Sequence, residues 1–264
     1  LCCLIFYYFC NLKRALLVLY NKLLKKNNIY IDIINKYINP LKNLTLIIPA
    51  KKEEDALPIF LEELKNYDCN ILIVASKDQH GYDEIIKNYK NIKIISQKNP
   101  GYGNALIEGL NFSKTEYSCI INADGSMNPK YLHEMLEKCI ENDFVFASRY
   151  EKQEAGSDDD TIVTLIGNKI FTFLGNLFFK LKISDILYTY ILGKTLSFKK
   201  LNLESSDFRL CVEIPIKAKK MKLKYVCSPS FERSRVAGFK KVNAIKDGFL
   251  ILIGMLSFIG KNYK

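Results

Sequence analysis

From residue 44 onward, short apolar runs alternate with segments of helical periodicity. Apolar runs of this length, bounded by turn residues, are typical of strands that are buried on both faces of a sheet. The predicted strands are 44–49, 71–75, 92–95, 117–121, 143–148, 192–198 and 225–231, and the predicted helices are 57–64, 83–89, 105–112, a segment from Pro129, 162–181 and 207–221. Because strands and helices alternate, we predict an α/β fold whose central sheet is mostly parallel and flanked by helices.

Several helical segments carry an unusual pattern. Residues 162–181 form a strongly amphipathic helix with a wide apolar stripe. In 207–221, Pro215 predicts a kink or a late helix start. Both ends of the chain are apolar, but the runs at 1–10 and 249–260 are shorter than the ~20 residues that span a bilayer.

These patterns predict three regions: an N-terminal apolar and basic segment (1–43), a globular domain (44–240) and a C-terminal apolar helix (241–264). The N-terminal segment is open to two interpretations, a membrane-proximal helix or a helix packed on the domain. The C-terminal run suits a helix half-sunk in a membrane surface.

The chain is basic, with 39 Lys and Arg against 28 Asp and Glu and a net charge of +11. This charge favours anionic partners such as phosphorylated small molecules or an acidic lipid surface. No aromatic RNA-binding motif, zinc knuckle or Arg-rich arm is present, so we do not expect a nucleic-acid partner. The eight cysteines contain no C-x-x-C pair and the chain has two histidines, which argues against a zinc site, a disulfide framework and a His-based triad.

A candidate for chemistry follows the strand at 117–121, where the sequence reads Asn122-Ala123-Asp124-Gly125. Ligands of α/β proteins bind at the carboxyl ends of sheet strands. A carboxylate at this position suits a hard divalent cation that carries a diphosphate. The alternative is a strand-to-helix turn in which Asp124 only caps backbone N–H groups.

Five motifs resemble, in order and spacing, those of the family 2 glycosyltransferases of GT-A fold, especially the dolichyl- or polyprenyl-phosphate sugar synthases. They are Ile47-Ile-Pro-Ala-Lys-Lys-Glu53, Gly101-Tyr-Gly-Asn-Ala105, Asn122-Ala-Asp124, Ser148-Arg-Tyr150 and Arg235-Val-Ala-Gly-Phe-Lys-Lys241. The resemblance covers about residues 44–252, and it implies the GT-A nucleotide-sugar-binding fold.

The resemblance also implies roles for individual residues. A donor such as a UDP- or GDP-sugar is expected to contact Pro49, Ala50, Glu53, Asp78, Gly101, Gly103, Asn104, Asn122, Ala123 and Lys241. Asp124 is expected to hold Mg²⁺ or Mn²⁺, which neutralises the leaving diphosphate. Arg149 and Arg235 are expected to donate to phosphate oxygens.

The expected acceptor depends on the nucleophile. A lipid phosphate is already anionic and needs positioning, whereas a saccharide hydroxyl needs a general base, for which Glu213 and Asp207 are the candidates. We expect an inverting transferase that uses a polyprenyl phosphate at the cytosolic membrane face, peripheral or anchored through a missing N-terminal segment. The alternatives are a saccharide acceptor or a non-catalytic, membrane-associated nucleotide-binding relative. The sequence does not indicate an oligomeric state.

The chain departs from the family pattern at three places, and two of them, Asn122 and Ile191, make that last alternative plausible. The first acidic residue of the metal motif is Asn122, the acidic pair after the second strand is Ala75-Ser76, and an Arg of the relatives is Ile191. They put the identity of the nucleotide and the sugar in question more than the type of reaction.

Overall fold

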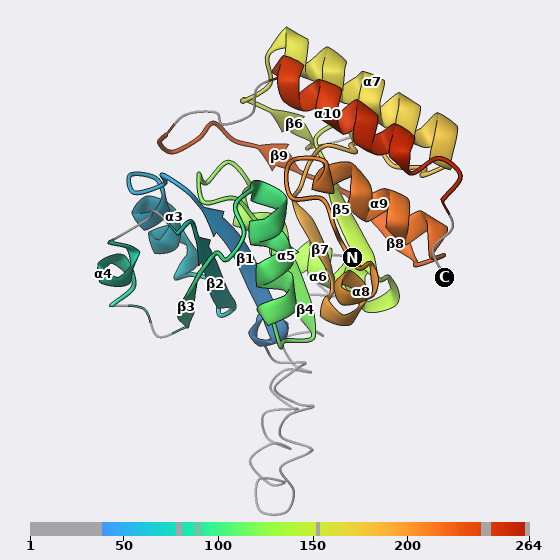
Figure 1. Ribbon diagram of the computed structural model, residues 1–264. Coiled ribbons are helices and arrows are strands. Elements are labelled where there is room, and N and C mark those ends of the chain that lie inside the picture. The colour runs from blue at the N-terminus through green and yellow to red at the C-terminus, as the bar shows by residue number, and fades with distance from the viewer. Residues whose placement is uncertain are drawn as a thin grey trace, which may run out of the picture.

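The computed structural model describes residues 39–77, 81–87, 89, 91–151, 154–238 and 244–261. The N-terminal segment up to residue 38, Asp78 and Lys241 lie outside these ranges. A seven-stranded sheet forms the centre, in the order β3-β2-β1-β4-β7-β5-β8 (Figure 1). Its strands are β1 (Leu44–Ala50), β2 (Asn70–Ala75), β3 (Ile92–Ser96), β4 (Tyr117–Ile120), β5 (Phe144–Ser148), β7 (Ile191–Lys194) and β8 (Tyr225–Pro229). Only β7 runs antiparallel to its neighbours β4 and β5, so the predicted mostly parallel α/β sheet is confirmed.

Helices cover both faces of the sheet. They are η1 (Pro40–Asn43), α3 (Leu57–Leu64), α4 (Tyr82–Ile86), α5 (Tyr102–Phe112), η2 (Pro129–Tyr131), α6 (Leu132–Glu141), α7 (Ile162–Phe179), α8 (Thr195–Lys200), α9 (Leu210–Lys220) and α10 (Ala244–Ser257). Side chains of β1 alternate between two cores, with Leu46 and Ile48 packed in the cluster of α3 and α6, and Ile47 in that of α5 and α9.

The parallel strands β1, β4 and β5 end at one edge of the sheet, which is where the candidate motifs lie. A short parallel pair, β6 (Gly156–Ser157) and β9 (Phe231–Glu232), sits beyond this edge (Figure 1). It joins the acidic loop 154–160 to the basic loop that begins after β9, because Asp158 N donates to Glu232 O at 2.9 Å. Two loops that are distant in the sequence are thereby held over the ends of β4 and β5.

Two predicted strands are shorter than expected. Strand pairing ends at Lys194, and residues 195–200 form helix α8, whose Phe198 packs edge-on against Phe144 at 4.8 Å. The predicted strand 225–231 is divided into β8 and β9. Helix α9 starts late, at Leu210, with Pro215 inside it.

Helix α7 has the predicted apolar stripe, but most of the stripe faces outward. The buried residues of α7 are Asn168, Thr172 and Gly175. Among the described residues, α7 is the one helix long and apolar enough to cross a membrane by length and composition. It lies beside α10 on top of the domain (Figure 1).

Candidate active site

Asp124 stands in the loop after β4 and is 4% exposed. Its Oδ1 accepts hydrogen bonds from Ser126 N at 3.1 Å and Ser126 Oγ at 2.8 Å, as expected of a capping residue. Its Oδ2 receives Nη1 of Arg235 at 2.7 Å. Asp124 therefore caps its own turn with one oxygen and offers the other to a cation.

Arg235 comes from the loop after β9 and reaches Asp124 across the sheet edge. The backbone of the same loop is fixed to that of the metal motif, since Val236 N donates to Asp124 O at 3.0 Å. Nη2 of Arg235 lies 3.3 Å from Asp159 Oδ2. Burial alone would lower the pKa of Arg235, but Asp124 and Asp159 outweigh that effect and raise it. The side chain is therefore a permanent cation.

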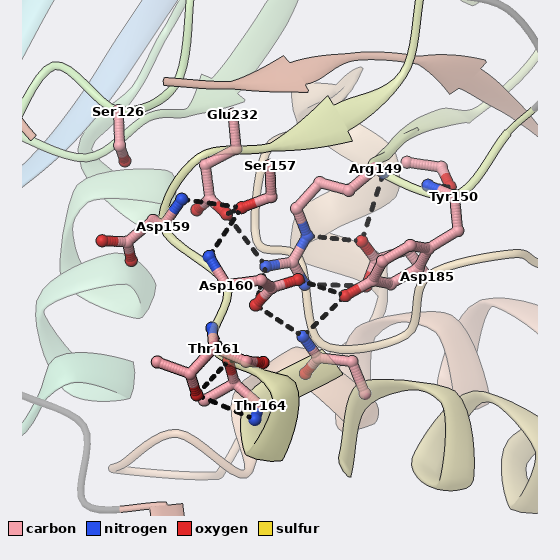
Figure 2. A network of polar contacts seen from close by, with 12 residues as sticks. Ser126, Arg149, Tyr150, Ser157, Asp159, Asp160, Thr161, Thr164, Asp185 and Glu232 are labelled. Carbon is pink, nitrogen blue, oxygen red and sulfur yellow. Dashed lines mark hydrogen bonds and ion pairs between the residues drawn. The ribbon is translucent and has the colours of Figure 1, made fainter. Parts of the chain in front are cut away.

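Arg149 follows β5 and is almost completely buried, at 8% exposure. Its Nε and Nη2 form a two-pronged contact with Asp185 at 2.7 and 3.1 Å, and Nη1 binds Glu232 at 3.0 Å (Figure 2). The guanidinium also lies 4.6 Å from the centre of the Tyr188 ring. Nε, Nη1 and Nη2 thus each donate to a protein carboxylate, which gives Arg149 a positioning role, while its expected contact with a phosphate stays a prediction.

The acidic loop is part of this network. Ser157 Oγ donates to Glu232 at 2.6 Å and accepts from the backbone N–H groups of Asp159 and Asp160 at 3.1 Å (Figure 2). Asp160 accepts from Tyr150 OH at 2.6 Å. The acidic run 158–160 is therefore not a purely solvated loop, because Asp159 and Asp160 bind side chains of the site.

Asn122, the residue in place of the first metal-motif carboxylate, faces α5. Its Oδ1 accepts from Tyr102 OH at 3.1 Å, and the same hydroxyl lies 2.9 Å from Thr189 Oγ1. Ala123 is buried. Ile191, which replaces an Arg of the relatives, is buried in β7 among apolar residues, where the side chain serves packing.

The two glycines that open α5 are sites of close backbone approach. A Cβ at Gly101 would meet Ser206 O at 2.1 Å, and one at Gly103 would meet Ser205 O at 2.0 Å. Asn104 N donates to Ser206 O at 3.2 Å. The structure thus explains both glycines by packing against loop 205–207, while their predicted contact with a donor stays a prediction.

The predicted nucleotide side lies at the end of β1. Ala50 is buried, and Pro49 is half-buried within the strand. The backbone N–H of Glu53 donates to Tyr82 OH at 3.1 Å, and its Oε2 would lie 3.5 Å from a Cβ at Gly238. Glu53 therefore adjoins the loop that carries Arg235.

Glu213 on α9 is fully buried, and both of its oxygens are engaged. Oε1 pairs with Lys217 Nζ at 2.6 Å and accepts from Glu204 N at 2.9 Å, while Oε2 accepts from Ser205 N at 2.8 Å. This is the loop that packs on the two glycines. The expected catalytic role of Glu213 is therefore not supported by its geometry, which assigns it to holding loop 204–205.

The donor atoms can be tested against the expected cation. Within the described residues, no group of three or more His, Cys, Asp or Glu side chains is placed to hold a metal ion. Mg²⁺ in phosphate chemistry needs only one or two carboxylates, because substrate phosphates and waters complete its shell. Asp124 Oδ2 fits that requirement, provided that Arg235 gives way or shares the oxygen.

Sequence reasoning missed four residues of this site, Asp159, Asp160, Asp185 and Glu232. The carboxylates of the last two are buried against Arg149. The available signal was the Arg of the Ser148-Arg149-Tyr150 motif, because an Arg between a buried strand and a loop needs buried anions. The sequence did not indicate which carboxylates these are.

Comparisons with known proteins agree with this architecture. Residues 45–201 match the family described as glycosyl transferase family 2. Chondroitin synthase of Escherichia coli is 26% identical over 114 residues, which cover 40% of this chain and 17% of that protein.

Solved structures give the same fold. Glucosyl-3-phosphoglycerate synthase of Mycobacterium tuberculosis, with Mn²⁺, UDP-glucose and glycerol 3-phosphate, aligns with a TM-score of 0.62 at 12% identity over 84% of this chain and 81% of that one. The same enzyme with Mg²⁺ and UDP aligns at 0.61 and 12%, over 84% and 80%. The predicted GT-A fold is confirmed.

Proposed function

The chain belongs to glycosyl transferase family 2, and from this premise we propose that it moves a sugar from a nucleoside-diphosphate sugar to a polyprenyl phosphate, with inversion at C1. The donor class is supported by fold neighbours crystallised with UDP or UDP-glucose and a divalent cation. The acceptor is a separate inference that depends on this chain's own residues.

The proposal of a phosphate acceptor rests on one observation: neither of the two candidate general bases, Glu213 and Asp207, is suited to accept a proton. Both oxygens of Glu213 are engaged in a buried ion pair and in backbone hydrogen bonds. Burial would raise the pKa of Asp207, but hydrogen bonds from Arg209 outweigh it and lower the pKa. A carboxylate with a lowered pKa is a weak general base. A phosphate acceptor needs no such base, because it is already anionic at neutral pH.

The residues at the sheet edge then divide the work. Asp124 would hold Mg²⁺ or Mn²⁺, which supplies charge neutralisation at the leaving diphosphate. Arg235 is the cationic side chain beside Asp124, and its Nε is buried without a hydrogen-bond partner in the part of the chain that the structure describes. Its guanidinium therefore keeps donor capacity for a phosphate oxygen. Arg149 holds the acidic loop in place.

The test is transfer of radiolabelled sugar from a panel of UDP- and GDP-sugars to polyprenyl phosphate, with Mg²⁺, Mn²⁺ or EDTA. We expect metal-dependent label in the organic phase, and loss of at least about 100-fold in Asp124→Asn, as for removal of an electrostatic group at a reacting centre. Asp158→Asn, in an exposed position of the acidic loop, is the matched control and is expected to keep its activity.

The outcomes separate the candidates. Full activity of Asp124→Asn with metal supplied would refute the proposed role of this carboxylate. Label in a water-soluble saccharide instead would favour a hydroxyl acceptor, the alternative raised by the similarity to chondroitin synthase. Donor binding without transfer or hydrolysis by the folded protein would identify a non-catalytic relative.

A further inference from the structure

Helix α7 turns its polar side toward the protein. Asn168 Nδ2 donates to Tyr150 OH at 2.8 Å, and Thr172 Oγ1 accepts from Ile186 N at 3.1 Å. One turn later, Asn176 Nδ2 donates to Ile183 O at 2.7 Å. A helix on the surface of a soluble domain usually shows the reverse arrangement, with its apolar stripe inside.

The opposite side of α7 is apolar and exposed. Its exposed large apolar residues are Ile162, Val163, Ile166, Ile170, Phe173, Leu177 and Phe178. Phe173 alone is 63% exposed. An apolar patch that continues along a whole helix marks an interaction surface, whereas single exposed apolar residues do not.

Helix α10 extends this patch. It runs beside α7 in Figure 1 and packs on the domain through Ile251 and Met255, and Phe258, directly after the helix, packs in the same core. Its other side exposes Ile245, Phe249, Ile253 and Leu256, and Ile259 follows just after the helix. We call the exposed apolar residues of both helices, with Ile259, the α7–α10 surface.

We infer that the α7–α10 surface lies in the lipid–water interface of a bilayer that contains anionic lipids. The inference rests on the proposed function, in which the acceptor is a membrane lipid. Lys169 is the only charged residue of α7, and it is exposed. Further exposed lysines stand at the ends of the two helices, Lys180, Lys246 and Lys261. The acidic residues there are Asp247 and, just before α7, the exposed Asp158, while Asp159 and Asp160 are engaged by side chains of the site. An apolar face with a basic rim matches the acyl chains and anionic headgroups of such a bilayer.

The surface is connected to the candidate site by short links. Thr161 is the N-cap of α7 and directly follows Asp160. Asn168 Nδ2 lies 3.3 Å from Asp160 Oδ1 and also binds Tyr150. The neighbouring Asp159 pairs with Arg235. A bilayer in contact with α7 would therefore adjoin the loop that positions Arg235, where a lipid phosphate has to arrive.

The chain contains no tryptophan, so one substitution creates a specific fluorescent reporter. We would make Phe173→Trp and Phe249→Trp in the full chain, with Ile140→Trp as control, because Ile140 is equally exposed, at 64%, but lies on α6. Vesicles of phosphatidylcholine and phosphatidylglycerol, with or without brominated acyl chains, are then added. We expect a blue shift and bromine quenching at positions 173 and 249 and neither at 140.

Two further measurements give magnitudes. Binding to vesicles of phosphatidylcholine alone should be roughly 30-fold weaker, for a net excess of two lysines at the surface. In the double variant Phe173→Glu/Phe249→Glu, vesicle binding should fall by at least about 100-fold, since two phenylalanine side chains that would be buried in the lipid are removed. Ile140→Glu should bind as the parent chain does.

Three results would overturn the inference. The first is vesicle binding without bromine quenching at 173 and 249, which would place the contact elsewhere in the chain. The second is a blue-shifted emission before lipid is added that depends on protein concentration, which would identify a second copy. The third is such an emission independent of concentration, which would identify another segment of this chain as the cover.

The transferase reaction is measured separately, with a short-chain, water-soluble prenyl phosphate. If bromine quenches both reporters but no sugar is transferred, the surface stands and the proposed function fails. If sugar is transferred but the reporters meet no lipid, the proposed function stands and the surface fails.

Discussion

Replacement of Arg149 by methionine should lower the free energy of unfolding more than the loss of any exposed ion pair would. The guanidinium neutralises Asp185, whose side chain is fully buried, and Glu232, whose side chain is 9% exposed. Removing the cation leaves two carboxylates in a poorly hydrated site. Breaking a buried ion pair from one side costs about 3–5 kcal/mol, out of a free energy of unfolding that is commonly about 5–15 kcal/mol.

The destabilisation by Arg149→Met should also depend on pH in a definite direction. Burial raises the pKa of Glu232 above its ordinary value, and Arg149 opposes that shift. Without Arg149 the pKa rises further, so the folded state binds a proton that the unfolded state does not bind between the two pKa values. For a carboxyl group whose pKa is raised in the folded state, the free energy of unfolding falls as the pH rises from the unfolded-state pKa through the folded-state pKa. The difference in unfolding free energy between the parent chain and Arg149→Met should therefore be smaller at about pH 5 than at pH 7.5.

The assay is urea unfolding followed by circular dichroism at both pH values. Arg209→Met is the matched control, because Arg209 forms an ion pair with Asp207 and both side chains are about one-third exposed. We expect that control to lose no more than about 1 kcal/mol. The reasoning is refuted if Arg149→Met is as stable as Arg209→Met, or if its deficit widens at acidic pH.

Two other outcomes test the assignments made around loop 204–207. Glu213→Gln should lower the urea midpoint, because it weakens the buried pair with Lys217, and should leave the pH profile of kcat unchanged; an altered profile would restore Glu213 as a general base. Gly103→Ala should destabilise the protein, since the new methyl group meets Ser205 O. Gly167→Ala lies inside α7, where a new Cβ has no neighbour within 4 Å, and it should raise the free energy of unfolding by about 1 kcal/mol in the same assay. Equal effects of the two glycine substitutions would contradict the close approach seen at Gly103.

Much of the sheet follows from local sequence, because each strand is a continuous apolar run with a turn signal after it. The first and last residues of β1, β2 and β4 agree with those of the predicted strands to within one residue. The short length of β7 was not predictable in this way. Its four residues are defined by pairing with β4 and β5, and no Pro or other turn signal in the sequence marks the change from β7 to α8.

The candidate site shows the same division between local and distant information. The motif around Asp124 and the cation at Arg235 were found, since both stand in recognisable spacings. Their mutual contact at 2.7 Å joins segments far apart in the chain, and only the fold reveals it. The orientation of α7 was likewise hidden, because a helical stripe gives the period of burial but not the medium that covers it.

The antiparallel strand β7 has a consequence for how the protein folds. It pairs with β4 on one side and with β5 on the other, although it follows β4 in the chain only after the whole segment that contains α6, β5 and α7. Contacts between distant segments form slowly, because the loop between them must first be closed. Asp124 belongs to the half that ends with β4, and Arg149 belongs to the half built on β5. Because β7 joins the two halves, we expect the candidate site to be complete only after β7 has paired with both β4 and β5.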